Sequence, residues 1–174
     1  LKGSALLFRF RGKSGKVWQL RITDRRIARI VRSVQDLPGQ DLFQYVDGEG
    51  EVRDVDSAAV NAYIRAVAGP QSSAKDFRTW NGTVLAARAL AEAGPFTSKR
   101  EAASKVRKAI SSVAERLGNT VAVCRASYVH PAIIDGYLAG KPCIPGEGRV
   151  VTEGLSAEES AVLTYLVAAQ RQAC

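Results

Sequence analysis

The sequence predicts an α+β fold that is mostly α-helical, with a small antiparallel β-sheet or hairpin at its N-terminal end. Apolar and polar residues alternate towards the end of residues 5–11 and again over 17–22, and turn residues lie between the two stretches. Beyond residue 56, apolar residues recur at helical spacing in several long stretches that glycine or proline ends. Strands that come first and helices that follow them indicate this fold class.

The composition limits the kind of partner. The 174 residues, 46% of them hydrophobic, suffice for one well-packed domain, and we expect one core. The net charge is +8, with basic residues spread along the chain, which indicates a polyanionic partner and favours nucleic acid over an acidic membrane surface. No apolar run approaches the roughly 20 residues of a membrane span, and no signal-peptide pattern is present, so we expect a soluble intracellular protein.

The cysteines indicate neither a disulfide framework nor a metal site. Cys124, Cys143 and Cys174 are far apart, and His130 is the only histidine, so a tetrahedral zinc site lacks ligands. We expect reduced thiols and no cofactor. The sequence lacks methionine, and an apolar stretch follows Leu1 almost directly, which is expected of a fragment.

The predicted hairpin carries a basic tip. Four apolar residues would share its buried side, namely Phe8, Phe10, Trp18 and Leu20. Lys13 and Lys16 lie in the glycine-containing turn. Such a tip is usually a solvated turn, although on a basic protein it can place an ammonium group beside a DNA phosphate.

Capping residues and helix breakers predict the remaining elements. The expected helices cover residues 25–35, with Ile27, Ile30, Val31 and Val34 on the apolar side, and residues 58–67, 73–93, 98–117, 132–138 and 156–171. Thr97 is the expected N-cap of the helix at 98–117. Short strands at residues 42–46 and 51–53 would complete a sheet of three or more strands.

The segment from Asn119 to Tyr128 brings an amide, a guanidinium and a phenol close together, the last two within Cys-Arg-Ala-Ser-Tyr. These groups suit phosphate chemistry. A phenol normally ionises only near pH 10, so a nucleophilic tyrosine needs neighbouring cations. A tyrosine at the end of a helix is more often a half-buried structural residue, and this segment alone leaves both interpretations open.

Three motifs together resemble the catalytic domain of type IB DNA topoisomerases, in particular its bacterial and poxvirus-like branch. They are Gly12-Lys13 in a hairpin, Lys75-Asp76-Phe77-Arg78-Thr79-Trp80 opening a helix, and Asn119 nine residues before Tyr128. The resemblance covers nearly the whole chain, and the motifs stand in the same order as in the family.

The resemblance implies a mechanism and a set of catalytic residues. Tyr128 would attack the DNA backbone to form a 3′-phosphotyrosyl link, the free 5′ end would swivel, and the 5′ hydroxyl would reseal the strand. Lys13 would be the general acid towards the 5′ oxygen, and Arg78 and Asn119 would bind the non-bridging oxygens. Cleavage of a phosphodiester needs hydrogen-bond donors fixed beside its non-bridging oxygens and an acid placed to protonate the leaving oxygen. Because the phosphotyrosyl bond conserves the energy of the broken link, relaxation of supercoiled DNA would need neither ATP nor metal.

The chain also departs from the family pattern. Some members have histidine where Asn119 stands. A further catalytic arginine of the family lies upstream of the hairpin, and this chain begins too late to contain it or the N-terminal clamp domain. We therefore expect an impaired, monomeric catalytic fragment that acts on double-stranded DNA in the bacterial cytoplasm, associated with the nucleoid. Residues 1–174 would form one domain, with the hairpin, a helix and short strands in 1–55 and the active site in the helical part, 56–174.

Five basic residues are candidates for contacts with the DNA backbone: Lys16, Lys75, Lys105, Arg107 and Arg125. A solvated helix face or turn is the competing interpretation for the first four. We expect Cys124 to be a packing residue. His130 precedes a proline and is expected to be a turn residue rather than a general base.

Two alternative functions stay open. A tyrosine recombinase uses the same nucleophile and phosphate clamp, but it usually shows a His-x-x-Arg motif, whereas Arg78 here follows Lys-Asp-Phe. A DNA-binding module without chemistry would need only the basic surface, with Tyr128 in a structural role.

Overall fold

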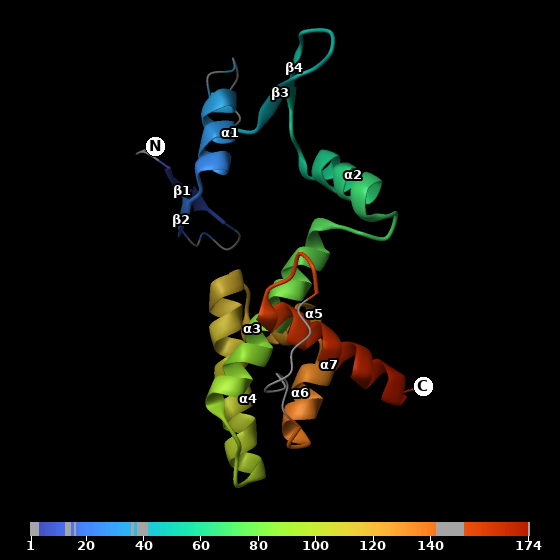
Figure 1. Ribbon diagram of the computed structural model, residues 1–174. Coiled ribbons are helices and arrows are strands. Elements are labelled where there is room, and N and C mark those ends of the chain that lie inside the picture. Colours follow the sequence, from blue (N-terminus) through green and yellow to red (C-terminus); the bar gives the residue numbers. More distant parts are fainter. Residues whose placement is uncertain are drawn as a thin grey trace. The chain divides into compact units, whose positions relative to one another are not determined.

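The computed structural model describes residues 4–173 apart from residues 13, 14, 16, 36, 38–41 and 142–151. All strands of the described residues end by Asp54, one helix lies between the two strand pairs, and the elements that follow are helices, which confirms the mostly helical α+β class (Figure 1). The chain divides into two compact units, Leu1–Gln71 and Ser72–Cys174. This division differs from the one inferred after residue 55, because the helix α2 (Ser57–Ala68) belongs to the first unit. One catalytic domain over the whole chain stays a prediction.

The first unit opens with the predicted hairpin. Strand β1 (Ala5–Arg11) pairs antiparallel with β2 (Val17–Thr23), and Phe8 lies opposite Leu20 while Phe10 lies opposite Trp18. Opposite residues share a face of the hairpin, as expected. That face is not buried along its length, however, since Phe10 and Leu20 keep 49% and 43% of their surface exposed. The expectation that all four side chains are buried is therefore wrong.

The helix α1 (Arg25–Gln35) explains why only one end of the hairpin is buried. Its Ala28 and Val31 form a small apolar cluster with Leu6, and Phe8 packs against that cluster. Ile27 and Ile30 remain exposed, so the buried side is narrower than the expected apolar stripe. The helix begins where predicted, because the Asp24 carboxylate accepts hydrogen bonds from the backbone N–H groups of Arg26 and Ile27.

The second hairpin is separate from the first. Strand β3 (Gln44–Val46) pairs with β4 (Val52–Asp54), and these strands do not join β1 and β2, so the expected sheet of three or more strands is wrong for the described residues. Asp47 closes the turn by accepting hydrogen bonds from the backbone of Glu49 and Glu51 and from Arg53 Nε at 2.9 Å. The backbone hydrogen bonds of each hairpin form between its own two strands, so neither hairpin has to pair with the other.

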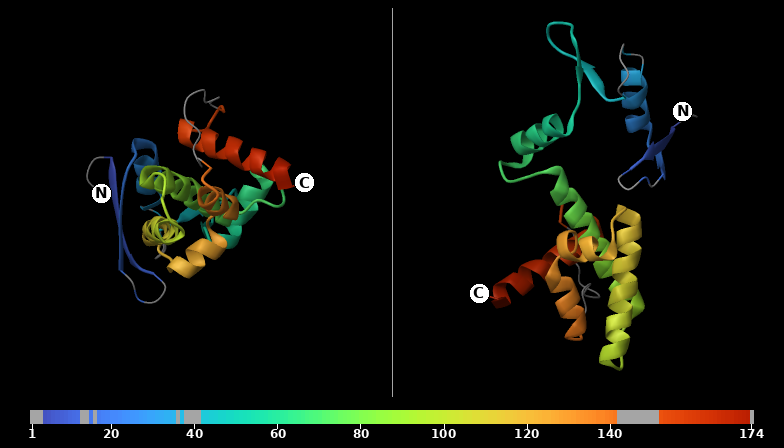
Figure 2. Two further views of the ribbon diagram at one scale, coloured as in Figure 1. Left: turned by 90° about the horizontal axis from the view of Figure 1, so that it is seen from below. Right: turned by 180° about the vertical axis from the view of Figure 1, so that it is seen from behind.

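The second unit is helical. It consists of α3 (Ala74–Ala93), α4 (Lys99–Leu117), α5 (Val121–Ser127), α6 (Pro131–Leu138) and α7 (Ala157–Ala173). Helix α3 packs against α4, α6 and α7, and the views in Figure 2 show these helices gathered around it. None of the helices formed by described residues is both long and apolar enough to span a bilayer.

The core of this unit is built from the apolar faces of its helices. Leu90, Ile110, Val113, Ile133 and Val162 are among its most deeply buried side chains. Burying each such side chain contributes about 1.5–3 kcal/mol before entropy is counted. The described residues thus form two apolar clusters, one in each unit, where the composition suggested one core.

The start of α4 is held by a network around Glu101. Ser98 is the N-cap, one residue after the expected Thr97. The backbone N–H and hydroxyl of Thr97 each donate to Glu101 Oε2 at 2.8 Å, and Lys105 Nζ lies 2.9 Å from Oε1. The Thr97 N–H, the Lys105 ammonium and the Thr97 hydroxyl stabilise the charged carboxylate and lower the pKa of Glu101 from 4.5 to about 2.

We expect Glu101 to titrate at about pH 2 in the folded protein, which carboxyl NMR can measure. Since its folded pKa lies below the unfolded value, this group stabilises the folded state above pH 4.5, and the contribution is lost as the pH falls towards 2. Glu101→Gln should reduce the loss of stability in that range, whereas Glu115→Gln, outside the network, should not. A Glu101 midpoint near 4.5 would contradict the network.

Candidate active site

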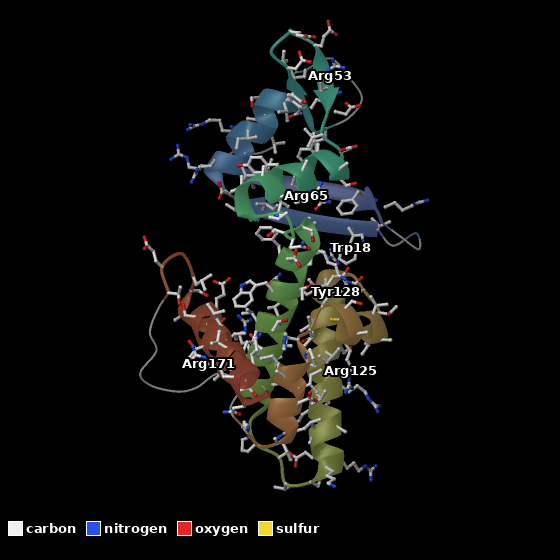
Figure 3. The ribbon with its side chains drawn as sticks, turned by 90° about the vertical axis from the view of Figure 1, so that its right-hand side faces the viewer. Trp18, Arg53, Arg65, Arg125, Tyr128 and Arg171 are labelled. Atoms are coloured by element: carbon white, nitrogen blue, oxygen red, sulfur yellow. The ribbon has the colours of Figure 1, made fainter. Side chains whose placement is uncertain are left out.

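Tyr128 lies at the junction of three helices. It is the C-cap of α5, its backbone N–H donates to the Cys124 carbonyl at 3.0 Å, and its side chain is half-buried. Figure 3 shows Tyr128 beside α3. A tyrosine at a helix end with part of its ring exposed can present its hydroxyl to a ligand while the ring stays anchored.

Arg78 projects from the first turns of α3 towards this tyrosine. Its Cζ atom lies 5.0 Å from the centroid of the Tyr128 ring, which is a cation–π distance. Its Nη2 donates to the Leu117 carbonyl oxygen at 2.9 Å. The start of α3 is set by Asp76, which accepts hydrogen bonds from the N–H and hydroxyl of Ser73 at 2.7 and 2.9 Å.

Asn119 completes the arrangement from the end of α4. Gly118 ends that helix in the left-handed region (φ 71°), and its N–H donates to carbonyls of the last turn. The chain therefore turns sharply, and Asn119 Nδ2 donates to the Leu117 carbonyl oxygen at 3.4 Å. Arg78 and Asn119, the two predicted phosphate ligands, thus donate to the same oxygen atom.

The shared acceptor has a physical explanation. Leu117 is the last residue of α4, where the helix dipole leaves partial negative charge on carbonyl groups that lack a helical partner. A guanidinium has five N–H donors, and the hydrogen bond to Leu117 uses one of them. The remaining N–H donors of Arg78 can therefore bind an oxyanion beside the tyrosine.

Three small residues of α3 hold the backbone on both sides of Tyr128. The Thr79 hydroxyl shares its proton between the Lys75 carbonyl at 3.1 Å and the Ser127 carbonyl at 3.4 Å, and Thr83 Oγ1 accepts from the His130 N–H at 3.1 Å. Between them, Gly82 lets the Tyr128 carbonyl approach the helix so closely that a Cβ atom would collide with it. We call Thr79, Gly82 and Thr83 the tyrosine seat.

Our sequence reasoning missed the tyrosine seat. Its members carry no obvious chemistry, and only their spacing of three and four positions on one face of a predicted helix could have drawn attention to them. The motif from Lys75 to Trp80 covers Thr79 but stops short of Gly82.

Trp80, the last residue of that motif, has a structural role, since its Nε1 donates to Glu159 of α7 at 3.1 Å.

We expect Gly82→Ala to destabilise the second unit by about 1–3 kcal/mol, although alanine normally favours a helix interior. The added methyl would meet the Tyr128 carbonyl and lie 3.1 Å from Leu117 Cδ1, so α3 and the tyrosine segment must separate. Urea unfolding followed by circular dichroism measures the change. Gly48→Ala is the control, because a Cβ there meets nothing within 4 Å. Equal stability of Gly82→Ala and the parent chain would contradict the close approach.

His130 and Cys124 have structural roles here. His130 is the N-cap of α6, and its Nδ1 accepts from the Ala132 N–H at 3.2 Å, which agrees with a turn residue. The Cys124 thiol is fully buried in the core, and burial raises its pKa, which confirms it as a packing residue. Within the described ranges, no three His, Cys, Asp or Glu side chains are grouped so that they could hold a metal ion.

The remaining basic candidates lie in different settings. Lys13 and Lys16 are outside the described residues, so the convergence of Lys13 with Tyr128 and the DNA contact of Lys16 stay predictions. Lys75 is exposed at the start of α3. Lys105 is already bound, since its ammonium donates to the Pro95 carbonyl at 2.6 Å and pairs with Glu101, and its side chain is only 23% exposed. It is therefore the weakest candidate for a DNA contact.

Arg107 and Arg125 lie together. With apolar residues of α4, α5 and α6, they line a cavity of about 260 Å³, next to the helix that ends at Tyr128. Both are exposed. Their contacts with DNA stay a prediction that this proximity to the tyrosine supports.

The fold and the site define a mostly helical core in which a tyrosine, an arginine and an asparagine meet at the ends of three helices. Residues 2–138 match the family model described as eukaryotic DNA topoisomerase I, catalytic core. The chain belongs to this family, and the resemblance to type IB topoisomerases is confirmed.

A curated relative supports the same assignment. DNA topoisomerase 1B of Acanthamoeba polyphaga mimivirus is 32% identical over 127 residues, which cover 69% of this chain and 38% of that protein. The chain therefore spans less than two fifths of the relative's length. Because this relative is viral, the bacterial origin expected from the sequence stays a prediction.

Proposed function

We propose that this chain carries the catalytic centre of a type IB DNA topoisomerase, which relaxes supercoiled DNA by transient cleavage of one strand. The observation that supports this most directly is the grouping of Arg78, Asn119 and Tyr128. The guanidinium lies over the tyrosine ring, and both nitrogen donors reach one oxygen atom. Donors converging on an oxygen beside a nucleophile are what phosphoryl transfer requires.

In the proposed reaction, the Tyr128 hydroxyl oxygen attacks the phosphorus and loses its proton to solvent. The bond from phosphorus to O5′ breaks, and that oxygen takes a proton from the general acid, for which Lys13 is the candidate. Arg78 and Asn119 donate to the non-bridging oxygens, where negative charge accumulates in the transition state. One phosphodiester bond replaces another, so the reverse attack by the 5′ hydroxyl reseals the strand without ATP.

The positive charge beside the ring assists this step. A guanidinium 5.0 Å from the ring centroid stabilises negative charge that develops on the attacking oxygen. The tyrosine seat contributes by holding the backbone before and after Tyr128, so the nucleophile loses little conformational freedom on reaction.

Relaxation of supercoiled plasmid by the 174-residue chain, with EDTA present and ATP absent, tests the proposal. We expect relaxed topoisomers and, after SDS is added, protein covalently attached to a 3′ end of the DNA. Binding without relaxation or adduct would support a non-catalytic DNA-binding module instead. Strand exchange that depends on two specific sites would indicate a recombinase.

A further inference from the structure

A second basic site lies in the first unit, on helix α1. This helix contains Arg25, Arg26, Arg29 and Arg32 and no acidic residue. Three of them, Arg25, Arg29 and Arg32, line a cavity of about 400 Å³ together with Ser4 and Ala28. We call this feature the arginine cavity.

The arginines of this cavity form a row. Positions 25, 29 and 32 are spaced by four and three residues, so they lie on one face of the helix. At a rise of about 1.5 Å per residue, the row extends for about 10 Å along the helix axis. Its base is rigid, because Ala28 is buried and packs with Leu6 and Val31.

The charges of Arg25 and Arg29 in this row are not balanced by carboxylates of the described residues. The acid nearest in sequence, Asp24, accepts hydrogen bonds from the N–H groups of Arg26 and Ile27 at 2.7 and 3.0 Å, and these bonds lower its pKa. Among the residues that the structure describes, no carboxylate forms an ion pair with Arg25 or Arg29. Like charges held side by side repel one another, and a bound polyanion relieves that repulsion.

We propose that the arginine cavity binds the phosphate backbone of duplex DNA as a contact in addition to the site at Tyr128. The proposal rests on the proposed function for the identity of the polyanion. A DNA strand presents one phosphate about every 3.4 Å along the duplex axis, and successive phosphates also wind around that axis, so a row about 10 Å long can serve about two of them. A single small anion would occupy only part of the row.

The lining favours the backbone over the bases. Arginine forks bind phosphate oxygens in pairs, and Ser4 adds a hydroxyl donor. Among the described residues that line the cavity, there is no aromatic side chain on which a base could stack. The cavity should therefore contribute affinity and orientation without sequence preference.

The test compares Arg29→Ala with Arg26→Ala, both in a Tyr128→Phe chain so that binding is measured without cleavage. Arg26 is the matched control, since it is on the same helix and carries the same charge but does not line the cavity. Fluorescence anisotropy with a 25-base-pair duplex, at several salt concentrations, yields the slope of log K against log salt. We expect Arg29→Ala to reduce the magnitude of the slope by about 1 and Arg26→Ala to change it by less than half as much.

Equal effects of the two substitutions would overturn the proposal, because they would indicate only the general positive field of the helix. No effect of either would overturn it as well. Titration with pyrophosphate separates the two sources of phosphate. Pyrophosphate that binds the parent chain but not Arg29→Ala, together with salt slopes for the duplex that Arg29→Ala leaves unchanged, would assign the cavity to a free anion and overturn the proposal. Circular dichroism verifies that both variants are folded.

These outcomes are independent of the proposed function. If Arg29→Ala weakens binding while the parent chain fails to relax plasmid, the contact stands and the enzymatic proposal fails. If the parent chain relaxes plasmid while both variants bind alike, the enzymatic proposal stands and the cavity contact fails.

Discussion

Tyr128→Phe should abolish plasmid relaxation and the SDS-trapped adduct while duplex binding stays within twofold of the parent chain. The substitution removes the oxygen atom that we propose forms the phosphotyrosyl bond, so we expect the rate to fall by at least about 10⁴-fold, as for other catalytic nucleophiles. The phenylalanine ring preserves the position beside Arg78. Since no described residue forms a hydrogen bond with the Tyr128 hydroxyl, the free energy of unfolding should change by less than about 0.5 kcal/mol.

Tyr63→Phe is the matched control for this substitution. Tyr63 lies on α2 and is 71% exposed. Tyr63→Phe removes one hydroxyl oxygen, as Tyr128→Phe does, but from a residue outside the group around Arg78. We expect Tyr63→Phe to relax plasmid at the parent rate. Relaxation by Tyr128→Phe at that rate, with an adduct still formed, would refute the assignment of the nucleophile.

Arg78→Ala should reduce the single-turnover cleavage rate by about 10²–10³-fold at saturating protein, with a much smaller effect on duplex affinity. The reason is that a donor aimed at the non-bridging oxygens stabilises the transition state more than the ground state. Arg78→Lys should recover only part of this loss, because an ammonium cannot bind two oxygens as a fork or stack on the tyrosine ring. Cleavage of a duplex that releases its short 5′ fragment irreversibly measures the rate.

Arg88→Ala provides the control for the removal of a charge from the same helix. Arg88 is partly exposed on α3 and pairs with Glu92, and it is not one of the residues grouped around Tyr128. We expect the Arg88→Ala chain to cleave DNA at the parent rate. An equal loss in both alanine variants would show that Arg78 acts through the charge of α3 rather than through its position over the tyrosine.

Many elements follow from local signals in the sequence. The hairpin follows from alternation around a glycine-containing turn, and α2 and α4 follow from short polar caps such as Asp56 and from Gly118. Such signals are reliable because capping hydrogen bonds and left-handed turns involve neighbouring residues only. Helix α1 begins where predicted for the same reason, because Asp24, directly before the helix, accepts hydrogen bonds from N–H groups of its first turn.

Features that depend on distant residues were predicted less well. The hairpin face with Phe10 and Leu20 looked like a buried face, but α1 covers only the end near Leu6. The four short strands looked like one sheet, but they form two separate pairs. Alternation shows which residues share a face and does not show whether another element covers it.

The sequence by itself determined the mostly helical α+β class, the approximate limits of most helices and the candidate group of Tyr128, Arg78 and Asn119. Only the tertiary structure decided that Arg78 lies over the tyrosine ring, that Arg78 and Asn119 share the Leu117 carbonyl, and that the tyrosine seat supports the segment from α3. The physical reason is that caps and periodicity act over a few residues. The contact of Arg78 with Leu117 and those of α3 with the Tyr128 segment instead join residues that are about 40 to 50 positions apart, so they form only when the helices pack.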